Sequence, residues 1–131
     1  MKSLIPDCIA PPFARYSHGV EIRSAARLVR TSGQLGWDVN GKIPVSPFEQ
    51  ARNCFNNILA ILLEADMDET HICHVSSYVT NREYMADYMK ARDLFFAERP
   101  DENLPSSTLV IVSGFSRPEF KVEVEVWACA D

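Results

Sequence analysis

The segment Thr-Leu-Val-Ile-Val at residues 108–112 limits what this chain can fold into, because it is apolar on both faces. Its length and its β-branched residues predict a strand, in which Leu109 points to one side and Val110 to the other. Strands of this kind are normally covered on both faces. One face of this strand must therefore be covered by other parts of the chain, and the other face needs a second covering layer.

A first helix is predicted to begin after Ser46. Ser46 is a favoured N-cap, Pro47 suits the first helical position, and Glu49 completes a capping box. Apolar residues then recur at the spacing of one helix face, while polar residues fill the opposite side. The apolar set is Phe48, Ala51, Phe55, Ile58, Leu59 and Leu62. This pattern predicts a helix of about five turns with one face on a core.

Five strands and a second helix complete the predicted order, which is β-β-α-β-α-β-β. Thr80 and Glu83 form the capping box of the second helix, and Pro100 ends it. Because each helix follows a strand, both helices can act as crossovers on one face of a mixed sheet. We therefore expect an α+β fold in a single domain, residues 1–131. The predicted strands span residues 18–22, 27–35, 71–80, 108–115 and 120–130.

The last strand fits a sheet with one covered face, because its valines alternate with charged residues. No third helix is predicted that could cover the other face of residues 108–112. An apolar patch of that size would otherwise face water, so a partner subunit is the natural cover.

Composition narrows the possible partners and location. The formal net charge is −5 and Lys and Arg form no cluster, so nucleic acid is not expected as a partner. No segment approaches about 18 uninterrupted apolar residues, so no membrane span is predicted. Pro6, Pro11 and Pro12 interrupt the apolar N-terminal stretch, which is not typical of a signal peptide. We expect a cytoplasmic protein.

Neither a metal nor a cofactor is expected. His71 and His74 would point to opposite faces of a strand and could not chelate one ion. Ser107 and Thr108 lack the histidine and the acid that a catalytic nucleophile needs. The cysteines form no C-x-x-C motif and are interpreted as reduced and structural. They are Cys8, Cys54, Cys73 and Cys129.

Several segments, in their order and spacing, resemble the RidA/YjgF family, also called the reactive intermediate deaminase or L-PSP endoribonuclease family. The segments are RYSHGV, RTSGQLG, NGKIP, FEQARNCFNNILAILLEADM, VSSYVTN, YMKARDLFF and RPEFKVEVEVWA. The resemblance implies a chorismate-mutase-like subunit that assembles into a homotrimer with a ligand cleft at each subunit interface. It also implies hydrolysis of enamines and imines, such as 2-aminoacrylate, to a keto acid and ammonia.

The resemblance assigns roles to individual residues. In the deaminases of the family, an arginine in a Pro-x-Arg motif grips the substrate carboxylate, and a glutamate on the last strand handles the water. A tyrosine and a Ser-Gly turn line the cleft. The glutamate corresponds to Glu123, the tyrosine to Tyr16, and the turn to Ser32 and Gly33. The arginine position holds Ser107, which removes a charge-assisted contact that nets about 1.5–3 kcal/mol.

Three further residues are predicted in this cleft. Met89 takes the position of an asparagine found in some members, so the cleft should be less polar or roomier. Arg15 is the basic residue nearest in sequence to the tyrosine and could replace the missing charge. His18 follows the tyrosine closely, although an exposed strand histidine would fit the same pattern.

Simpler interpretations exist for the main candidates. Glu123 could be a surface carboxylate paired with Arg or Lys. Tyr16 could be an aromatic plug at the edge of the sheet. Ser32 and Gly33 could form a turn or bulge in which only glycine fits.

The sequence thus favours a hydrolytic imine or enamine deaminase that acts on a small metabolite of imine, enamine or keto acid type. Its substrate preference should differ from 2-aminoacrylate. A trimer that binds ligands without catalysis is the alternative, supported by the serine at residue 107. A ribonuclease or translation inhibitor is the least favoured, because the chain is acidic and lacks a basic stripe.

Overall fold

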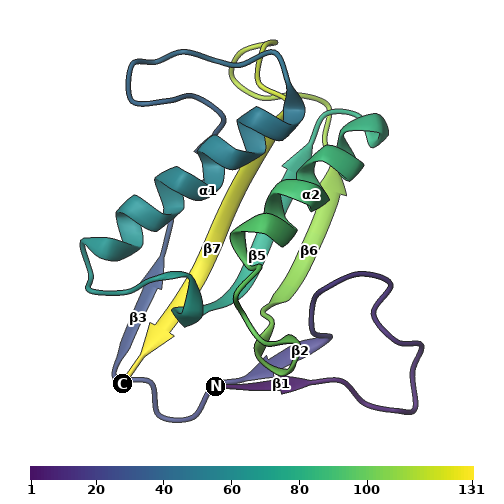
Figure 1. Cartoon of the computed structure of the whole chain (residues 1–131), viewed down its shortest axis with the longest axis vertical. Coiled ribbons are helices and arrows are strands. Elements are labelled where there is room, and N and C mark those ends of the chain that lie inside the picture. The colour runs from purple at the N-terminus through teal and green to yellow at the C-terminus, as the bar shows by residue number, and fades with distance from the viewer.

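A computed structural model describes residues 1–131, and its main layer is a mixed sheet with the strand order β3-β7-β5-β6 (Figure 1). Strands β5 and β6 are parallel, whereas β7 runs antiparallel to its neighbours, including the short β4. Both long helices, α1 and α2, lie on one face (Figure 1). The predicted α+β fold is confirmed. The elements are β3 Arg27–Arg30, β4 Gln34–Leu35, α1 Pro47–Leu63, β5 Ile72–Val79, α2 Met85–Phe95, β6 Ser106–Ile111 and β7 Val122–Ala130.

Helix α1 begins where its sequence predicts. Ser46 Oγ accepts a hydrogen bond from the Glu49 amide at 3.3 Å, and Pro47 is the first helical residue. The apolar face of α1, including Phe55 and Ile58, packs over β7 in a core of 17 buried residues. Helix α2 is the crossover between the parallel strands β5 and β6.

The start of the second helical segment differs from the prediction. Asn81, not Thr80, is its cap, since Asn81 Oδ1 accepts a hydrogen bond from the Glu83 amide at 2.9 Å. A single 3-10 turn, η2 (Arg82–Tyr84), precedes α2. Asparagine is as good an N-cap as threonine, so the sequence pattern placed the cap one residue early. Two more 3-10 turns are η1 (Glu69–His71) and η3 (Asp101–Asn103).

The N-terminal strands also differ in detail from the predicted order. Strand β2 (Gly19–Glu21) pairs with an additional strand, β1 (Lys2–Leu4), in a separate two-stranded antiparallel sheet. Ser17 fastens this segment beside β6, because its amide donates to Pro105 O at 3.0 Å and its hydroxyl to Leu104 O at 2.9 Å. The segment around Tyr16 therefore lies beside the start of β6.

The strand predicted for residues 27–35 is interrupted in the structure. Thr31 donates its amide to Val126 O and accepts from the Val126 amide through Oγ1, both at 3.0 Å. A side-chain oxygen thus replaces a backbone carbonyl in the ladder, and the chain then passes through Ser32 and Gly33 before β4 begins. The interruption carries these two residues over the first half of β7.

A buried glutamine joins α1 to two loops. Gln50 Nε2 donates to Pro44 O at 2.7 Å and to Glu119 O at 2.9 Å, while Gln50 Oε1 accepts from the Lys121 amide at 2.8 Å. Gln50 is fully buried. Its amide group therefore satisfies three backbone groups next to the start of β7.

The second face of the sheet carries no helix (Figure 1). Val110 in β6 points to this face and is 41% exposed, as expected for a strand whose outer face this chain does not cover. No helix in the structure has both the length and the apolarity of a membrane span.

Candidate functional site

Glu123 lies on the helix-free face of the sheet. Its neighbours Val122 and Val124 are in the core beneath the helices, so alternation along β7 points Glu123 the other way. In the sheet, Glu123 is opposite Leu35 of β4 on one side and Tyr78 of β5 on the other. The carboxylate is therefore held near the start of β7, between two paired strands.

The protonation of Glu123 is shifted toward the neutral form. Burial raises its pKa above the usual value of 4.5, and the neighbouring charge of Glu125 raises it further. A carboxylate with a raised pKa is a stronger base when ionised than an ordinary surface glutamate. Glu125 itself accepts from Tyr78 Oη at 3.1 Å and lies 3.8 Å from Arg30 Nη2.

Gly33 passes directly over the Glu123 carboxylate. A Cβ atom on Gly33 would lie 2.1 Å from Glu123 Oε1 and 2.7 Å from Cδ, so no side chain fits while the carboxylate keeps this position. Ser32 and Gly33 also line a polar hollow of about 470 Å³ with Arg30, Thr31 and Glu125. The structure thus brings three predicted residues, Ser32, Gly33 and Glu123, to one place.

A second group of predicted residues lines a smaller pocket of about 140 Å³ at the start of α2 and β6. Its lining combines predicted residues with apolar neighbours and one arginine. It consists of Phe13, Tyr16, Met85, Met89, Arg92, Ser107 and Leu109. We call this space the Arg92 pocket.

Ser107 faces the helices from its place in β6. Its partner in β5, Val75, belongs to the core, and Ser107 lies against Tyr88 of α2. Burial raises the pKa of Tyr88 to about 12, although hydrogen bonds with Ser77 and Ser107 act in the opposite direction. Glu123 and Ser107 therefore point to opposite faces of the sheet and do not meet within one chain.

Arg92 was not among the residues singled out from the sequence. It is 5% exposed, and its Nε and Nη2 donate to Asp93 Oδ1 at 3.1 and 2.9 Å. The signal was present in the helix pattern, because Met85, Met89 and Arg92 are four and three residues apart and share one face. The charge of an arginine gives no indication of burial, since arginine is usually exposed.

Arg15 and His18 lie outside the Arg92 pocket. Arg15 donates to Asp101 Oδ1 at 2.9 Å and to Arg99 O at 3.2 Å, so its guanidinium is occupied by the η3 turn. The prediction that Arg15 replaces the missing charge gains no support from this position. His18 Nε2 lies 2.9 Å from Ala10 O, and its ring packs edge-on to Tyr16.

The two predicted strand histidines have separate partners. His71 Nδ1 lies 2.8 Å from Asp68 Oδ1, whereas His74 Nδ1 lies 2.7 Å from Ser106 Oγ. Burial lowers the pKa of His74, although the charge of Glu125 partly opposes this shift. No cluster of three or more His, Cys, Asp or Glu side chains could hold a metal ion.

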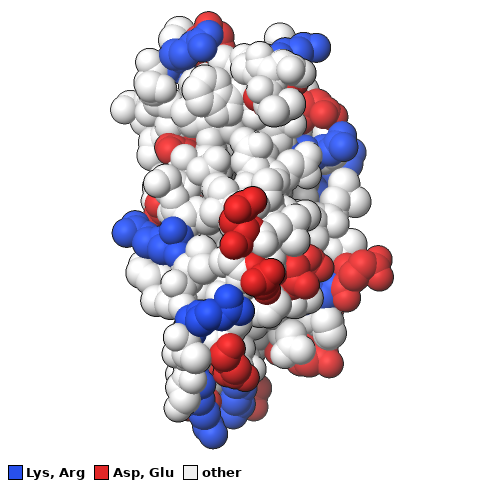
Figure 2. Space-filling model, turned by 90° about the vertical axis from the view of Figure 1, so that its left-hand side faces the viewer, with Lys and Arg blue, Asp and Glu red and all other residues white.

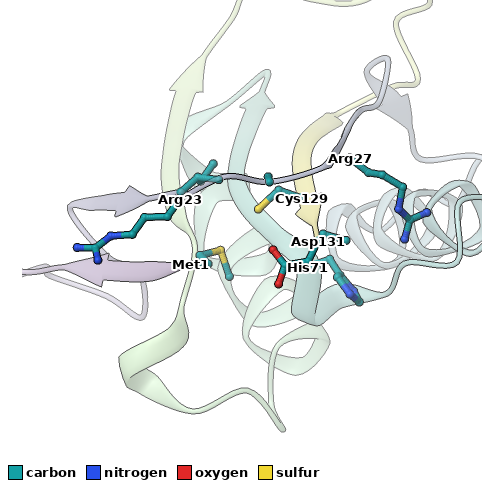
Figure 3. Close-up of a pocket in the computed structure, with 9 residues that line it drawn as sticks. Met1, Arg23, Arg27, His71, Cys129 and Asp131 are labelled. Atoms are coloured by element: carbon teal, nitrogen blue, oxygen red, sulfur yellow. The ribbon is translucent and has the colours of Figure 1, made fainter.

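Another hollow, of about 380 Å³, lies between the two ends of the chain (Figure 3). The side chains of Arg23 and Arg27 extend away from it in opposite directions (Figure 3). Arg23 pairs with Glu21 at 3.0 Å, and Arg27 Nη1 donates to Ala65 O at 2.7 Å. The cationic groups of Arg23 and Arg27 therefore do not converge on this hollow, and none of the predicted site residues lines it.

Comparisons with known proteins support the family resemblance. The sequence model described as Endoribonuclease L-PSP matches residues 8–130. A search of curated proteins gave no significant match. Among solved structures, the chain is similar to YyfB of the Rid protein family from Yersinia pestis, with a TM-score of 0.84 and 21% identity over 97% of this chain and 96% of that one.

Two proteins from E. coli are also similar. TdcF, solved with bound serine, has a TM-score of 0.74 and 26% identity over 97% of this chain and 94% of that one. The YjgF gene product has a TM-score of 0.74 and 23% identity over the whole of both chains. At 21% and 23% identity, the likenesses to YyfB and YjgF show the fold alone.

Proposed function

Because the chain belongs to the endoribonuclease L-PSP family, which includes the RidA/YjgF proteins, we propose that it hydrolyses an imine or enamine of a small metabolite. The observation that carries this proposal is the Glu123 carboxylate, partly buried, with a raised pKa, and held against the backbone at Gly33. Such a carboxylate can orient a water molecule and remove its proton near neutral pH.

The proposed reaction begins with an enamine that takes up a proton on carbon to become an imine, or with the imine itself. Water adds to the carbon of the C=N bond while Glu123 accepts one of its protons. Glu123 passes this proton to nitrogen, which gives an amino alcohol. The hydroxyl proton then also moves to nitrogen, the C–N bond breaks to release ammonia, and the C=O bond forms. The balance is one imine and one water to one carbonyl compound and one ammonia.

We propose a homotrimer in which neighbouring subunits complete each site. Two observations support assembly: the exposed Val110 on the helix-free face, and the separation of Glu123 and Ser107 on opposite faces of one sheet. A cleft between two subunits could join the Glu123 side of one protomer to the Arg92 pocket of its partner. Oligomers commonly build their sites in this way.

The proposed substrate differs from a small 2-imino acid such as 2-aminoacrylate. Ser107 offers one neutral hydroxyl where an arginine would offer a cationic fork, and it is turned toward Tyr88. Met89 adds an apolar wall nearby. Both changes favour a ligand with more apolar surface.

Ammonia release from a broad panel of imines, generated in situ from amino acids, tests the proposal. Glu123→Ala should lower the rate on accepted imines by about a hundredfold or more, as expected for loss of a general base. Glu102→Gln, a change on an exposed turn, is the matched control and should leave the rate unchanged. Equal background rates for wild type and Glu123→Ala across the panel would refute hydrolysis.

A trimer that binds a metabolite without hydrolysing it is the second candidate, favoured by Ser107. In that case a ligand bound to the purified protein would be recovered unchanged after long incubation. The same ligand would bind Glu123→Ala as tightly as it binds wild type. Turnover of that ligand would exclude this candidate.

Cleavage of RNA has less support than either, although the family is described by that activity. The net charge is −5, and on the face drawn in Figure 2 the basic and acidic side chains are interspersed, with no continuous basic stripe. RNA cleavage that survives stringent purification and is lost in Glu123→Ala would revive it.

A further inference from the structure

One nearly buried cation lies in a pocket that is otherwise mostly apolar. Arg92 is 5% exposed and shares the Arg92 pocket with the apolar side chains of Phe13, Met85, Met89 and Leu109. Burial of a charge is costly unless the charge is paired. The only carboxylate bonded to Arg92 is that of Asp93, which is 41% exposed.

The ion pair uses only one side of the guanidinium. Nε and Nη2 both donate to Asp93 Oδ1, which leaves Nη1 without a hydrogen-bond partner in the chain. Nη1 is open to solvent, since every buried polar side-chain atom of the chain has a hydrogen-bond partner. An arginine with a free donor at the mouth of a pocket binds carboxylates well, because charge and planar geometry match. The hydroxyl of Tyr16 and that of Ser107 line the same pocket and add neutral donors.

The apolar lining of the pocket determines which kind of ligand body can carry the carboxylate. A cavity of about 150 Å³ lined by aliphatic and aromatic side chains can hold a benzene ring. The Arg92 pocket has about 140 Å³ and two methionines in its wall, which adapt readily to aromatic or branched groups. A ligand without an apolar body would leave this wall in contact with water.

We propose that the Arg92 pocket binds a carboxylate with an aromatic or branched apolar body, and that Arg92 anchors its charge. The assignment rests on the proposed function, since it names the ligand class for the same cleft. Helix α2 then supplies the charge that β6 lacks at Ser107.

Three small probes test the assignment on the full chain by isothermal titration calorimetry. Hydrocinnamate carries both the carboxylate and the ring, hydrocinnamide keeps the shape without the charge, and acetate keeps the charge without the ring. Hydrocinnamate should bind at least about tenfold more tightly than either of the others, as a charged hydrogen bond and a buried ring require. Equal affinities for hydrocinnamate and hydrocinnamide, or no binding of hydrocinnamate, would overturn the proposal.

Two arginine variants locate the charge. Arg92→Met keeps the length of the side chain and should weaken hydrocinnamate binding by about tenfold or more while leaving hydrocinnamide unaffected. Arg15→Met is the matched control, because Arg15 is bound to Asp101 outside the pocket, and it should leave both affinities unchanged. Loss of binding in Arg15→Met but not in Arg92→Met would overturn the assignment. The comparison of the three probes uses only the wild-type protein, so its result does not depend on whether the variants fold.

The outcome is separable from that of the proposed hydrolysis. If Glu123→Ala keeps wild-type ammonia release while binding still depends on Arg92, the catalytic proposal fails and the ligand assignment stands. If Glu123→Ala abolishes ammonia release while Arg92→Met changes neither binding nor KM, hydrolysis stands and the role of Arg92 is refuted.

Discussion

The Cα atom of Gly33 lies so close to the Glu123 side chain that an added methyl group would be 2.1 Å from Oε1. Contact of this kind joins two segments that are far apart in the sequence, the interruption after β3 and the start of β7. It holds a partly buried carboxylate against the backbone, where water must approach from the remaining side. The position of the proposed base therefore depends on the absence of a side chain at residue 33.

Gly33→Ala should damage activity more than stability. The new methyl group meets the end of a flexible side chain, which can move, so the melting temperature should change by only a few degrees. The carboxylate must shift by an ångström or more, which can cost about a hundredfold in rate. Ammonia release and thermal unfolding measure the two effects. Gly114→Ala, where an added Cβ meets nothing within 4 Å, should change neither.

The raised pKa of Glu123 should make part of the stability depend on pH. The unfolded chain loses this proton near the usual pKa of 4.5, whereas the folded chain loses it at higher pH. As pH rises through this interval, the free energy of unfolding falls, and the loss persists at neutral pH. Glu123→Gln cannot ionise, so it should raise the melting temperature near neutral pH and have little effect below about pH 4.

The ionisation of Glu123 should also make the rate of hydrolysis depend on pH. The base form of Glu123 is required, so kcat/KM should increase with pH up to the folded pKa and then level off. Glu102→Gln, on an exposed turn, should leave both the pH profile and the stability curve as in wild type. A wild-type profile that is flat between pH 4 and 8 would exclude Glu123 as the base.

Val110→Asp should disrupt the proposed trimer. Val110 is 41% exposed on the helix-free face, and a charge there would have to be buried on assembly. Light scattering after size exclusion should give a mass threefold lower than that of wild type. Val39→Asp, at a loop residue that is 97% exposed, should keep the wild-type mass. A wild-type protein that is already monomeric would contradict the proposal.

Gln50→Ala should destabilise the fold by about 2–4 kcal/mol, because it leaves three backbone groups near β7 without their partner. Asn56→Ala, on the exposed side of the same helix, should change the free energy of unfolding by no more than about 0.5 kcal/mol. Urea unfolding of both variants gives the comparison. A small effect for Gln50→Ala would mean that water replaces the amide group.

The four thiols should differ strongly in reactivity. Burial raises the pKa of Cys73 to about 11 and that of Cys54 further still, whereas Cys8 is exposed. An alkylating reagent at mildly alkaline pH should label Cys8 quickly and the buried thiols only after unfolding, as peptide mass spectrometry would show. Rapid labelling of Cys54 in the native protein would be inconsistent with this core.

Much of the fold could be predicted because the relevant signals are local. Ser46 and Pro47 mark the start of α1, and the alternation of Val122 and Glu123 gives the two faces of β7. Crossover helices follow from the order of strands and helices. The additional strand β1 was missed because three residues before a proline-rich segment carry little periodic signal.

The remaining features depend on contacts between distant segments. The break between β3 and β4 requires Thr31 to bond with Val126 and Gly33 to lie over Glu123, and neither contact leaves a pattern near residue 30. The location of Arg92 could have been inferred from its spacing to Met89. Its burial could not, since arginine is usually exposed.

Strand β7 pairs with β3, β4 and β5, although the ribosome makes it after all of them. This internal strand of the sheet is thus missing while the chain grows, and the part of α1 that packs on β7 stays uncovered. Contacts between residues about 100 apart also slow folding, because a long loop must close first. Until synthesis reaches residue 130, the nascent protein exposes the surfaces that chaperones recognise and that favour aggregation.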